Sequence, residues 1–296
     1  MFDHIQFTGL ATSTQFEYAK ALAFFKQHAS LTFKPGLNIL LGPNGCGQST
    51  VLKILGDSMC ATQGGVSTLS EGAVQSGVNM IASFGSHRGP SDNHGVAVAH
   101  DGRPVVFCDP RQTVGVDGGH FDDDFFQEGM VELGRRGSTG QNSLDRLSTV
   151  MGILDGRVPF PEKVQIKIRR DHVNDLWQQA LDVLEKRFVA SIPRGQPSLL
   201  LDEPEANFSL RWQARLWQRL AQPALADRFQ LIVATHSPFA LNIPHANYIE
   251  FEPGTRAEVE SILHARFGST PPKPAPSKRP RKPKAKTTYD ASSASK

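Results

Sequence analysis

The residues with the clearest chemical potential form one glycine-rich stretch, which reads Gly42, Pro43, Asn44, Gly45, Cys46, Gly47, Gln48, Ser49 and Thr50. Apolar residues at 37–41 predict a buried strand before it, and residues 51–60 predict a helix after it. This is the context of a phosphate-binding loop, because glycines let backbone N–H groups curl around phosphates at the positive end of a helix dipole. Ser49 stands where the motif places a hydroxyl group on Mg²⁺. The stretch therefore predicts a site for nucleotide phosphates and Mg²⁺.

One position departs from this motif, which requires lysine where the chain has Gln48. A glutamine amide can donate a hydrogen bond to a phosphate but carries no charge, and charge-assisted hydrogen bonds are about twice as strong as neutral ones. We expect weaker phosphate binding and, because charge develops in the transition state, still weaker hydrolysis. Three interpretations are open: an engineered change that disables a working ATPase, a natural ATPase without the lysine, and a chance glycine-rich turn.

Two acidic residues and a histidine follow two further apolar runs. Asp202 and Glu203 come directly after residues 199–201, and His236 follows the run 230–234 closely. The carboxyl ends of parallel strands are where α/β proteins bind ligands. There Asp202 could support Mg²⁺, Glu203 could act as general base on the attacking water, and His236 could reach the terminal phosphate. The alternatives are a strand that happens to end in acidic residues and a structural histidine.

Two weaker signals lie between these motifs. Residues 135–147 combine small residues, a serine able to cap a helix and then a helical pattern, so they predict a helix N-terminus that could hold an anion. The stretch 115–124 predicts a loop, in which His120 and the aspartates at 122–124 could suggest a metal site. A solvated acidic loop is the simpler alternative, because consecutive aspartates cannot all face one ion.

The remaining patterns predict an α/β fold. Strands are expected at 5–7, 31–33 and 246–251, and a hairpin with an Asp-Gly turn is expected over 95–107. Helices are expected over 172–188, with an apolar stripe of Leu176, Ala180, Leu184 and Phe188; over 208–221, with Trp212 and Trp217 packed under the sheet; and over 256–267.

Composition bounds the class of protein. The chain has 296 residues, of which 39% are hydrophobic and 21% charged, as in soluble globular proteins. Its apolar runs are far shorter than the roughly 20 residues that span a membrane, and residues 1–5 lack the pattern of a signal peptide. Cys46, Cys60 and Cys108 have no metal-ligand spacing and indicate free thiols. These features predict a cytoplasmic protein without membrane contact.

Residues 269–296 predict a disordered polybasic tail. From Thr270 onward there are eight Lys or Arg residues and one acidic residue, whereas the rest of the chain has 24 basic and 28 acidic residues. Pro, Lys, Ser and Ala dominate this segment, which cannot bury enough apolar surface to fold. The tail could bind nucleic acid electrostatically, and a solubilising or linker role is the alternative.

Taken together, the loop at 42–50, Ser-Thr-Gly-Gln at 138–141, LLLDEPE at 199–205 and ATHSP at 234–238 resemble the ABC-type ATPases. The resemblance covers most of residues 28–252. It is closest to the small bacterial AAA-family ATPases that are related to the SMC, RecF and OLD groups.

This resemblance implies a P-loop NTPase fold of the ABC-ATPase type. A mixed central sheet would lie within an ATPase domain at 1–268. An inserted antiparallel β subdomain would occupy about 62–120 and a helical signature subdomain about 125–190.

The resemblance also implies residue roles, with ATP and Mg²⁺ as cofactors. Ser49 and Asp202 would hold the metal, Glu203 would activate water, and His236 would be the switch histidine. A glutamine would join the metal site, where Gln127 is favoured over Gln112. Three residues of the signature would contact the γ-phosphate of the opposite subunit, so that two chains sandwich two ATP molecules head to tail: Ser138, Gly140 and Gln141.

Finally, the resemblance implies an ATP-driven dimerisation switch. Bacterial relatives serve DNA repair or anti-phage defence, commonly beside a separately encoded nuclease, and no nuclease motif is visible in this chain. One alternative is the nucleotide-binding subunit of an ABC transporter, although residues 204–209 lack the aspartate that ends a transporter D-loop. The other is a non-hydrolysing nucleotide-sensing scaffold, which Gln48 favours but an intact Glu203 and His236 oppose.

Overall fold

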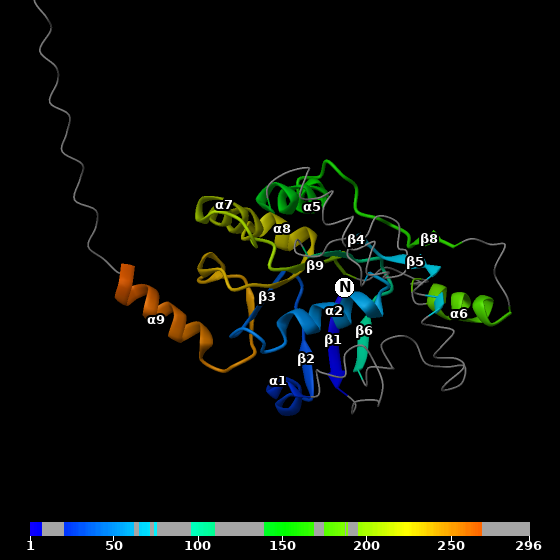
Figure 1. The fold of residues 1–296 in the computed structure, drawn as a ribbon, viewed down its shortest axis with the longest axis horizontal. Helices are drawn as coiled ribbons and strands as arrows, with labels where there is room; N and C mark the ends of the chain where they lie inside the picture. The colour runs from blue at the N-terminus through cyan, green and yellow to red at the C-terminus, as the bar shows by residue number, and fades with distance from the viewer. Residues whose placement is uncertain are drawn as a thin grey trace, which may run out of the picture.

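A mixed six-stranded sheet lies at the centre of the molecule (Figure 1). The computed structural model describes residues 1–7, 21–61, 65–71, 74–75, 96–109, 139–168, 175–186, 188 and 195–267. All neighbouring strands of the sheet run parallel except the last pair. The predicted α/β fold with a mixed central sheet is confirmed. The strand order is β11 (Asn247–Glu250), β3 (Leu37–Leu41), β10 (Gln230–Ala234), β9 (Ser198–Asp202), β7 (Val106–Cys108) and β4 (Gly65–Val66).

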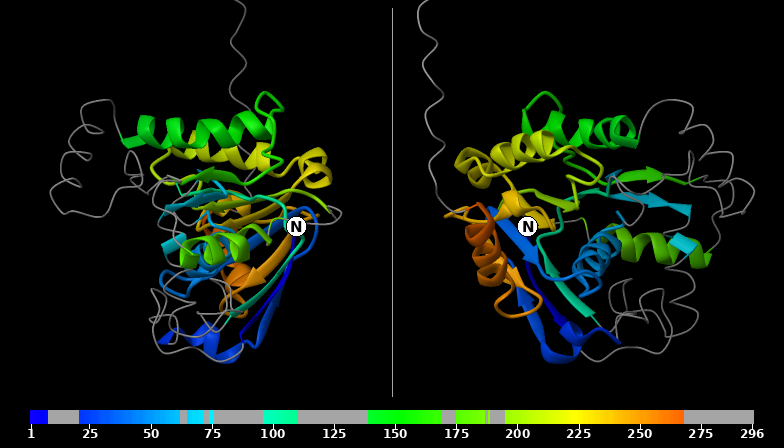
Figure 2. Two further views of the ribbon diagram at one scale, coloured as in Figure 1. Left: turned by 90° about the vertical axis from the view of Figure 1, so that its right-hand side faces the viewer. Right: turned by 60° about the vertical axis from the view of Figure 1, so that its left-hand side comes forward.

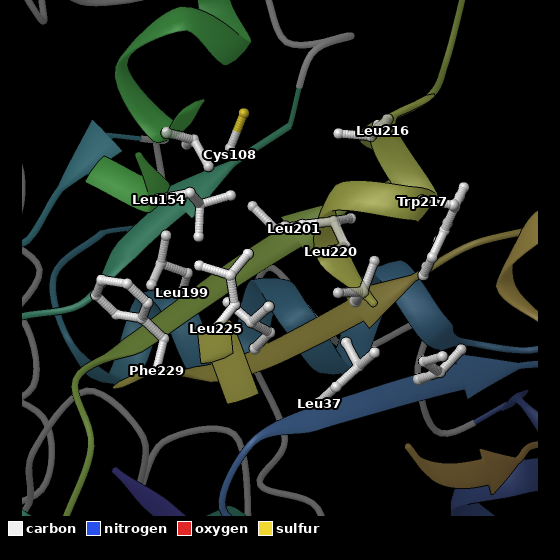
Figure 3. Packing of buried hydrophobic residues seen from close by; sticks show 14 of the residues in the cluster. Leu37, Cys108, Leu154, Leu199, Leu201, Leu216, Trp217, Leu220, Leu225 and Phe229 are labelled. Carbon is white, nitrogen blue, oxygen red and sulfur yellow. The ribbon is translucent and has the colours of Figure 1, made fainter. Parts of the chain in front are cut away.

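The central strands are buried on both faces, and their side chains alternate between two cores. Leu199 and Leu201 of β9 face a helical layer, where Figure 3 shows Leu201 near Leu220 and Leu199 near Leu225. Leu200 faces the opposite core. The helical layer consists of α5 (Thr139–Leu154), α7 (Leu210–Leu220) and α8 (Pro223–Arg228), whereas α2 (Gln48–Ser58) fills the opposite core.

A three-stranded antiparallel sheet closes the α2 side of the molecule. Its order is β2 (Ser30–Thr32), β1 (Phe2–Phe7) and β6 (Val96–His100). Figure 2 shows β1 and β2 on the side of the central sheet away from α5 and α7. Phe2 and Ile5 are fully buried in one cluster with Leu52 and Leu55 of α2. The first helix after the glycine-rich loop is therefore held between two sheets.

The predicted hairpin at 95–107 was wrong. The turn exists, with Gly102 at φ 80°, but β6 pairs with β1 whereas β7 pairs with β9 and β4. The two strands enter different sheets because the residues of β7 are all apolar and buried, which suits a strand inside a largely parallel sheet. The remaining described strand of this region, β5 (Thr68–Ser70), pairs with β8 (Gln165–Lys167) in a third sheet.

The predicted outer helices exist, but two of their apolar residues were misplaced. In α6 (Asp175–Lys186), Ala180 and Leu184 are buried, whereas Leu176 is exposed. In α7, Trp217 is buried but Trp212 is exposed, because it lies near the helix start on the side away from the sheet. The last helix, α9 (Thr255–Phe267), stands apart from both layers and buries none of its residues (Figure 1).

Candidate functional site

The glycine-rich loop joins β3 to α2 as the sequence predicts. Gly47 is the N-cap of α2 with φ 114°, and Gly45 has φ 78°, both of which residues with side chains avoid. A Cβ atom on Gly42 would lie 2.6 Å from Sγ of Cys46, and one on Gly47 would lie 3.0 Å from the Phe25 ring. The loop leads into a helix N-terminus, whose first N–H groups have no acceptor within the helix and favour an anion.

The other loop residues differ in exposure. Pro43, Asn44 and Gly45 are exposed, whereas Thr50 is buried. Cys46 is half-buried, and burial raises the pKa of its thiol. The Cys46 side chain is therefore an uncharged packing group of the loop at neutral pH.

Ser49 and Asp202 meet although they lie far apart in the sequence. The Ser49 hydroxyl donates a hydrogen bond to Oδ1 of Asp202 at 2.8 Å, and Asp202 is fully buried. Asp202 follows Leu201, so the alternation along β9 directs its side chain to the same face as Leu200, where α2 lies. The tertiary structure thus joins the two residues that the sequence predicts as metal ligands.

The donor set of this pair fits Mg²⁺. Hydroxyl and carboxylate oxygens suit this hard cation, which usually takes one or two carboxylates and completes its shell with substrate phosphates and water. Within the described ranges, no group of three or more His, Cys, Asp or Glu residues could hold a metal ion. Ser49 and Asp202 therefore fit a Mg²⁺ ion that arrives with nucleotide phosphates.

Gln48 is hydrogen-bonded to the strand that precedes the loop. Its Nε2 donates a hydrogen bond to the backbone carbonyl of Leu40 at 2.9 Å, and the residue is only 5% exposed. Leu40 belongs to β3, so the amide joins the start of α2 to the strand that precedes the loop. This glutamine acts as a strut within the loop, and it supplies no charge to a bound anion.

Glu203 and His236 face one another at the ends of β9 and β10. Their side chains come within 3.8 Å, from Oε1 of Glu203 to Nε2 of His236. Both are partly exposed, at 25% and 38% respectively, so water can reach them. Glu203 has φ 45°, an uncommon value for a residue with a side chain, and its N–H donates to the Ala234 carbonyl at 2.9 Å. The arrangement can orient a water molecule between a carboxylate and an imidazole.

Sequence reasoning missed Glu205. This residue is 5% exposed, and the Thr235 hydroxyl donates a hydrogen bond to its Oε1. Burial raises the pKa of the Glu205 carboxyl, and the nearby Glu203 charge adds to this effect. The available signal was the position of Glu205 within the turn that directly follows Asp202 and Glu203.

Several predicted residues lie outside the described part of the chain. These are Gln112, His120, the aspartates at 122–124, Gln127, Ser138 and the tail at 269–296. The backbone of Gly140 and Gln141 lies in the first turn of α5, but the Gln141 side chain is outside the described part. The signature and the glutamine of the metal site stay predictions.

Comparison with known proteins bears on this site. Residues 182–242 match a family described as "AAA domain, putative AbiEii toxin, Type IV TA system". The matched segment contains β9, α7 and β10, and with them Asp202, Glu203 and His236. Curated proteins show no match to the chain.

Two solved structures are among those similar to the chain. The ATP-binding cassette MJ0796, in a dimeric post-hydrolysis state bound to ADP and Pi, is 15% identical, with 84% of this chain and 94% of that chain covered at a TM-score of 0.32. MJ1267, an ATP-binding cassette of an ABC transporter, is 10% identical, with 88% of this chain and 99% of that chain covered at a TM-score of 0.31. A likeness this weak carries no conclusion about function.

The class of protein therefore rests on the chain itself and on the family match. The glycine-rich loop between β3 and α2 and the contact of Ser49 with Asp202 are typical of P-loop nucleotide-binding proteins, and residues 182–242 are similar to an AAA domain. Among the described residues, no helix combines the length and the apolar character that crossing a membrane requires.

Proposed function

We propose that the chain binds ATP with Mg²⁺ at the glycine-rich loop and belongs mechanistically to the ATPases that use this binding as a switch. The observation that carries the proposal is the hydrogen bond between Ser49 and Asp202. Ser49 lies in the first turn of α2 and Asp202 at the end of β9, and their hydroxyl and carboxylate oxygens at a helix N-terminus would suit a Mg²⁺ ion bound to phosphates. When bound, Mg²⁺ would neutralise charge on the phosphates.

Hydrolysis would depend on Glu203 and His236. Glu203 would hold a water molecule and accept its proton as general base, a role that typically contributes about 10²- to 10⁴-fold in rate. His236, 3.8 Å from Glu203, would donate a hydrogen bond toward the terminal phosphate or the same water. The side chains of both residues are partly exposed, so a substrate can contact them, whereas the side chain of Asp202 is fully buried.

Gln48 sets the level of activity in this proposal. Since its amide is engaged with the Leu40 carbonyl, phosphates would be held by backbone N–H groups and Mg²⁺ without a lysine charge. We expect measurable ATP binding and slow hydrolysis. A non-hydrolysing nucleotide sensor is the second candidate, and the buried position of the Gln48 amide favours it.

The assembly and the partners follow from the resemblance. The Ser-Thr-Gly-Gln stretch would complete the site of a second copy, so ATP would join two chains head to tail. The dimer would signal to a separate effector in DNA repair or anti-phage defence, such as a nuclease. The basic tail would add nucleic-acid binding that weakens with salt.

The test compares four proteins: the chain itself, Gln48→Lys, Glu203→Gln in the lysine background, and Glu258→Gln as a control on the exposed face of α9. Binding is measured with a fluorescent ATP analogue, turnover by phosphate release, and oligomeric state by light scattering. We expect Gln48→Lys to hydrolyse ATP and dimerise with it. Glu203→Gln should then lower turnover at least about 100-fold while ATP stays bound. A Gln48→Lys protein that binds no ATP would overturn the proposal.

A further inference from the structure

A buried carboxyl group lies directly behind the Glu203–His236 pair. Glu205 is 5% exposed, its Oε1 accepts the Thr235 hydroxyl, and its Oε2 has no hydrogen-bond partner among the described residues. Leaving a buried polar atom unpaired costs about 1–3 kcal/mol. Such a cost at the edge of a site is more typical of function than of stability.

Thr235 connects this carboxyl to the loop that carries His236. The Thr235 oxygen accepts the backbone N–H of Ser237 at 2.9 Å while its hydroxyl donates to Glu205. The first of these hydrogen bonds joins the residues on either side of His236, and the second joins Thr235 to Glu205. The Ser237 hydroxyl in turn donates to Oε1 of Gln213 on α7 at 3.2 Å.

A second hydrogen bond between these two segments involves the backbone of Glu203 itself. Its backbone N–H donates to the Ala234 carbonyl at 2.9 Å. The turn after β9 is therefore joined to the end of β10 and the residue after it at two points, once through Glu203 and Ala234 and once through Glu205 and Thr235. Glu203 is part of the first contact, and His236 directly follows Thr235 of the second.

We propose that Glu205 is a positioning residue, which fixes the separation of Glu203 and His236 through Thr235 and does not itself contact the nucleotide. The proposal rests on the ATPase function proposed above. It assigns to the second glutamate of the Asp202–Glu205 run a role distinct from that of the first.

Glu205 performs this role as a hydrogen-bond acceptor for the Thr235 hydroxyl. Burial raises the pKa of its carboxyl, and the Thr235 hydrogen bond opposes that rise. Glutamate and glutamine side chains have almost the same shape, and both present an oxygen to the Thr235 hydroxyl. Glu205→Gln should therefore preserve the geometry that Glu205→Ala removes.

The experiment measures geometry and turnover separately. Glu205→Gln, Glu205→Ala and Thr235→Val are prepared in the chain and in its Gln48→Lys form, with Thr255→Val as the matched control at the exposed start of α9. NMR spectra without nucleotide report the His236 ring signals and the Ser237 amide signal. Turnover and affinity for the ATP analogue are then measured.

We expect Glu205→Ala and Thr235→Val to shift both NMR signals and to lower kcat by about 10- to 100-fold, as loss of supporting contacts does at other sites. The Kd for the ATP analogue should change less than about 3-fold, because the phosphate-binding loop is untouched. Glu205→Gln and Thr255→Val should resemble their parent in all three readouts.

Two results would overturn the proposal. One is unchanged His236 and Ser237 signals in both Glu205→Ala and Thr235→Val. The other is a Glu205→Gln protein as impaired as Glu205→Ala, which would mean that charge rather than position matters. The NMR arm needs no nucleotide, so it decides the role of Glu205 even if no variant binds ATP, a result that would overturn only the ATPase function.

Discussion

The amino ends and the carboxyl ends of the central parallel strands differ in the kinds of side chains that they carry. At the amino ends of β3, β9 and β10, neutral amide side chains tie the strands to their surroundings. At the carboxyl ends of the same strands, carboxylates and positive φ values gather. The strands share one sheet and one core, so the difference between their ends separates what stabilises this fold from what equips it to act.

Gln230 shows how the amino ends are built. Its Oε1 accepts the Phe2 N–H and the Ser198 hydroxyl, both at 2.8 Å, and its Nε2 donates to the carbonyls of Phe2 and Lys34. One buried amide thus joins β1, β9 and β10. Every donor and acceptor on its side chain is used, which is the condition under which burying a polar group is tolerated.

Asn38 repeats this arrangement on β3. Its Oδ1 accepts the N–H of Lys34 at 2.8 Å and the Nδ2 of Asn247 at 2.9 Å, while its own Nδ2 donates to the Lys34 carbonyl. Neutral side chains at this end carry no charge whose desolvation must be offset. This end of the sheet is optimised for stability.

The carboxyl ends show the opposite pattern. Asp202 is a fully buried acidic residue. Glu203 and Asn207 have φ values of 45° and 67°. Glu205 has one carboxyl oxygen without a hydrogen-bond partner among the described residues. Strain and unpaired groups of this kind cluster at functional sites. Four predictions test this division, from the largest expected effect to the smallest.

Gln230→Ala should cause the largest loss of stability. It removes four hydrogen bonds and leaves backbone groups of Phe2 buried and unpaired, so we expect the free energy of unfolding to fall by about 3–5 kcal/mol. Chemical denaturation followed by circular dichroism measures this change. Gln178→Ala on the exposed face of α6 is the control and should change stability by less than about 0.5 kcal/mol. Similar losses of unfolding free energy in Gln230→Ala and Gln178→Ala would show that the amides at the amino ends of the strands do not stabilise the fold.

Asp202→Asn should leave the fold intact and remove the effect of the ligand. Asparagine keeps an oxygen for the Ser49 hydroxyl but lacks the charge that Mg²⁺ needs. Mg²⁺ and ATP at 100 times the Kd should stabilise the parent by about 2.7 kcal/mol, and this gain should vanish in the variant. Thermal unfolding with and without Mg²⁺ and ATP measures both quantities. A stabilised Asp202→Asn protein would place the metal elsewhere.

Glu205→Gln should change how stability depends on pH. Because burial raises the folded pKa of Glu205 above its ordinary value of 4.5, the folded state binds the proton more tightly. The stability that this group contributes is present at low pH and is lost as pH rises from 4.5 through the folded pKa. The variant should therefore gain on the parent by up to about 1.4 kcal/mol per pH unit across that window. A difference in unfolding free energy between parent and variant that stays the same at all pH values would exclude uptake of a proton by Glu205.

Gln48→Ala should have the smallest effect. It removes one hydrogen bond to the Leu40 carbonyl, which is worth about 1 kcal/mol of stability. Denaturation measures the loss, and Asn44→Ala in the exposed part of the same loop is the control. A destabilisation indistinguishable from that of Asn44→Ala would show that Gln48 is no strut and leave its amide available to phosphates.

The elements that sequence reasoning predicted well were those with local signals. The strand before the glycine-rich loop, the loop itself and the helix after it are where they were expected, because glycine spacing and an uninterrupted apolar run are local properties. The runs before Asp202 and His236 predicted β9 and β10 for the same reason. Ser49 and Asp202, which the sequence places at one edge of the sheet, lie within hydrogen-bond distance, and their role as metal ligands stays a prediction.

Other features depended on partners that are distant in the sequence. The Asp-Gly turn after β6 looks like a hairpin turn, but only the competition between sheets decides that β6 joins β1 and β7 joins β9. Trp212 and Trp217 occur in the same helix, and only the direction in which α7 packs separates the exposed ring from the buried one. The clamp of Gln230 on Phe2 spans more than two hundred residues and leaves no pattern in either segment.

The sequence by itself determined the glycine-rich loop between strand and helix, the buried strands and the acidic strand end, because each depends on residues that are neighbours along the chain. Only the tertiary structure decided that Gln48 turns back to Leu40, that Glu205 is buried against Thr235, and that Glu203 and His236 lie within 3.8 Å. Those outcomes depend on which segments, distant in the sequence, the fold packs against one another. Such packing is a property of the whole molecule, and no single segment of the chain encodes it.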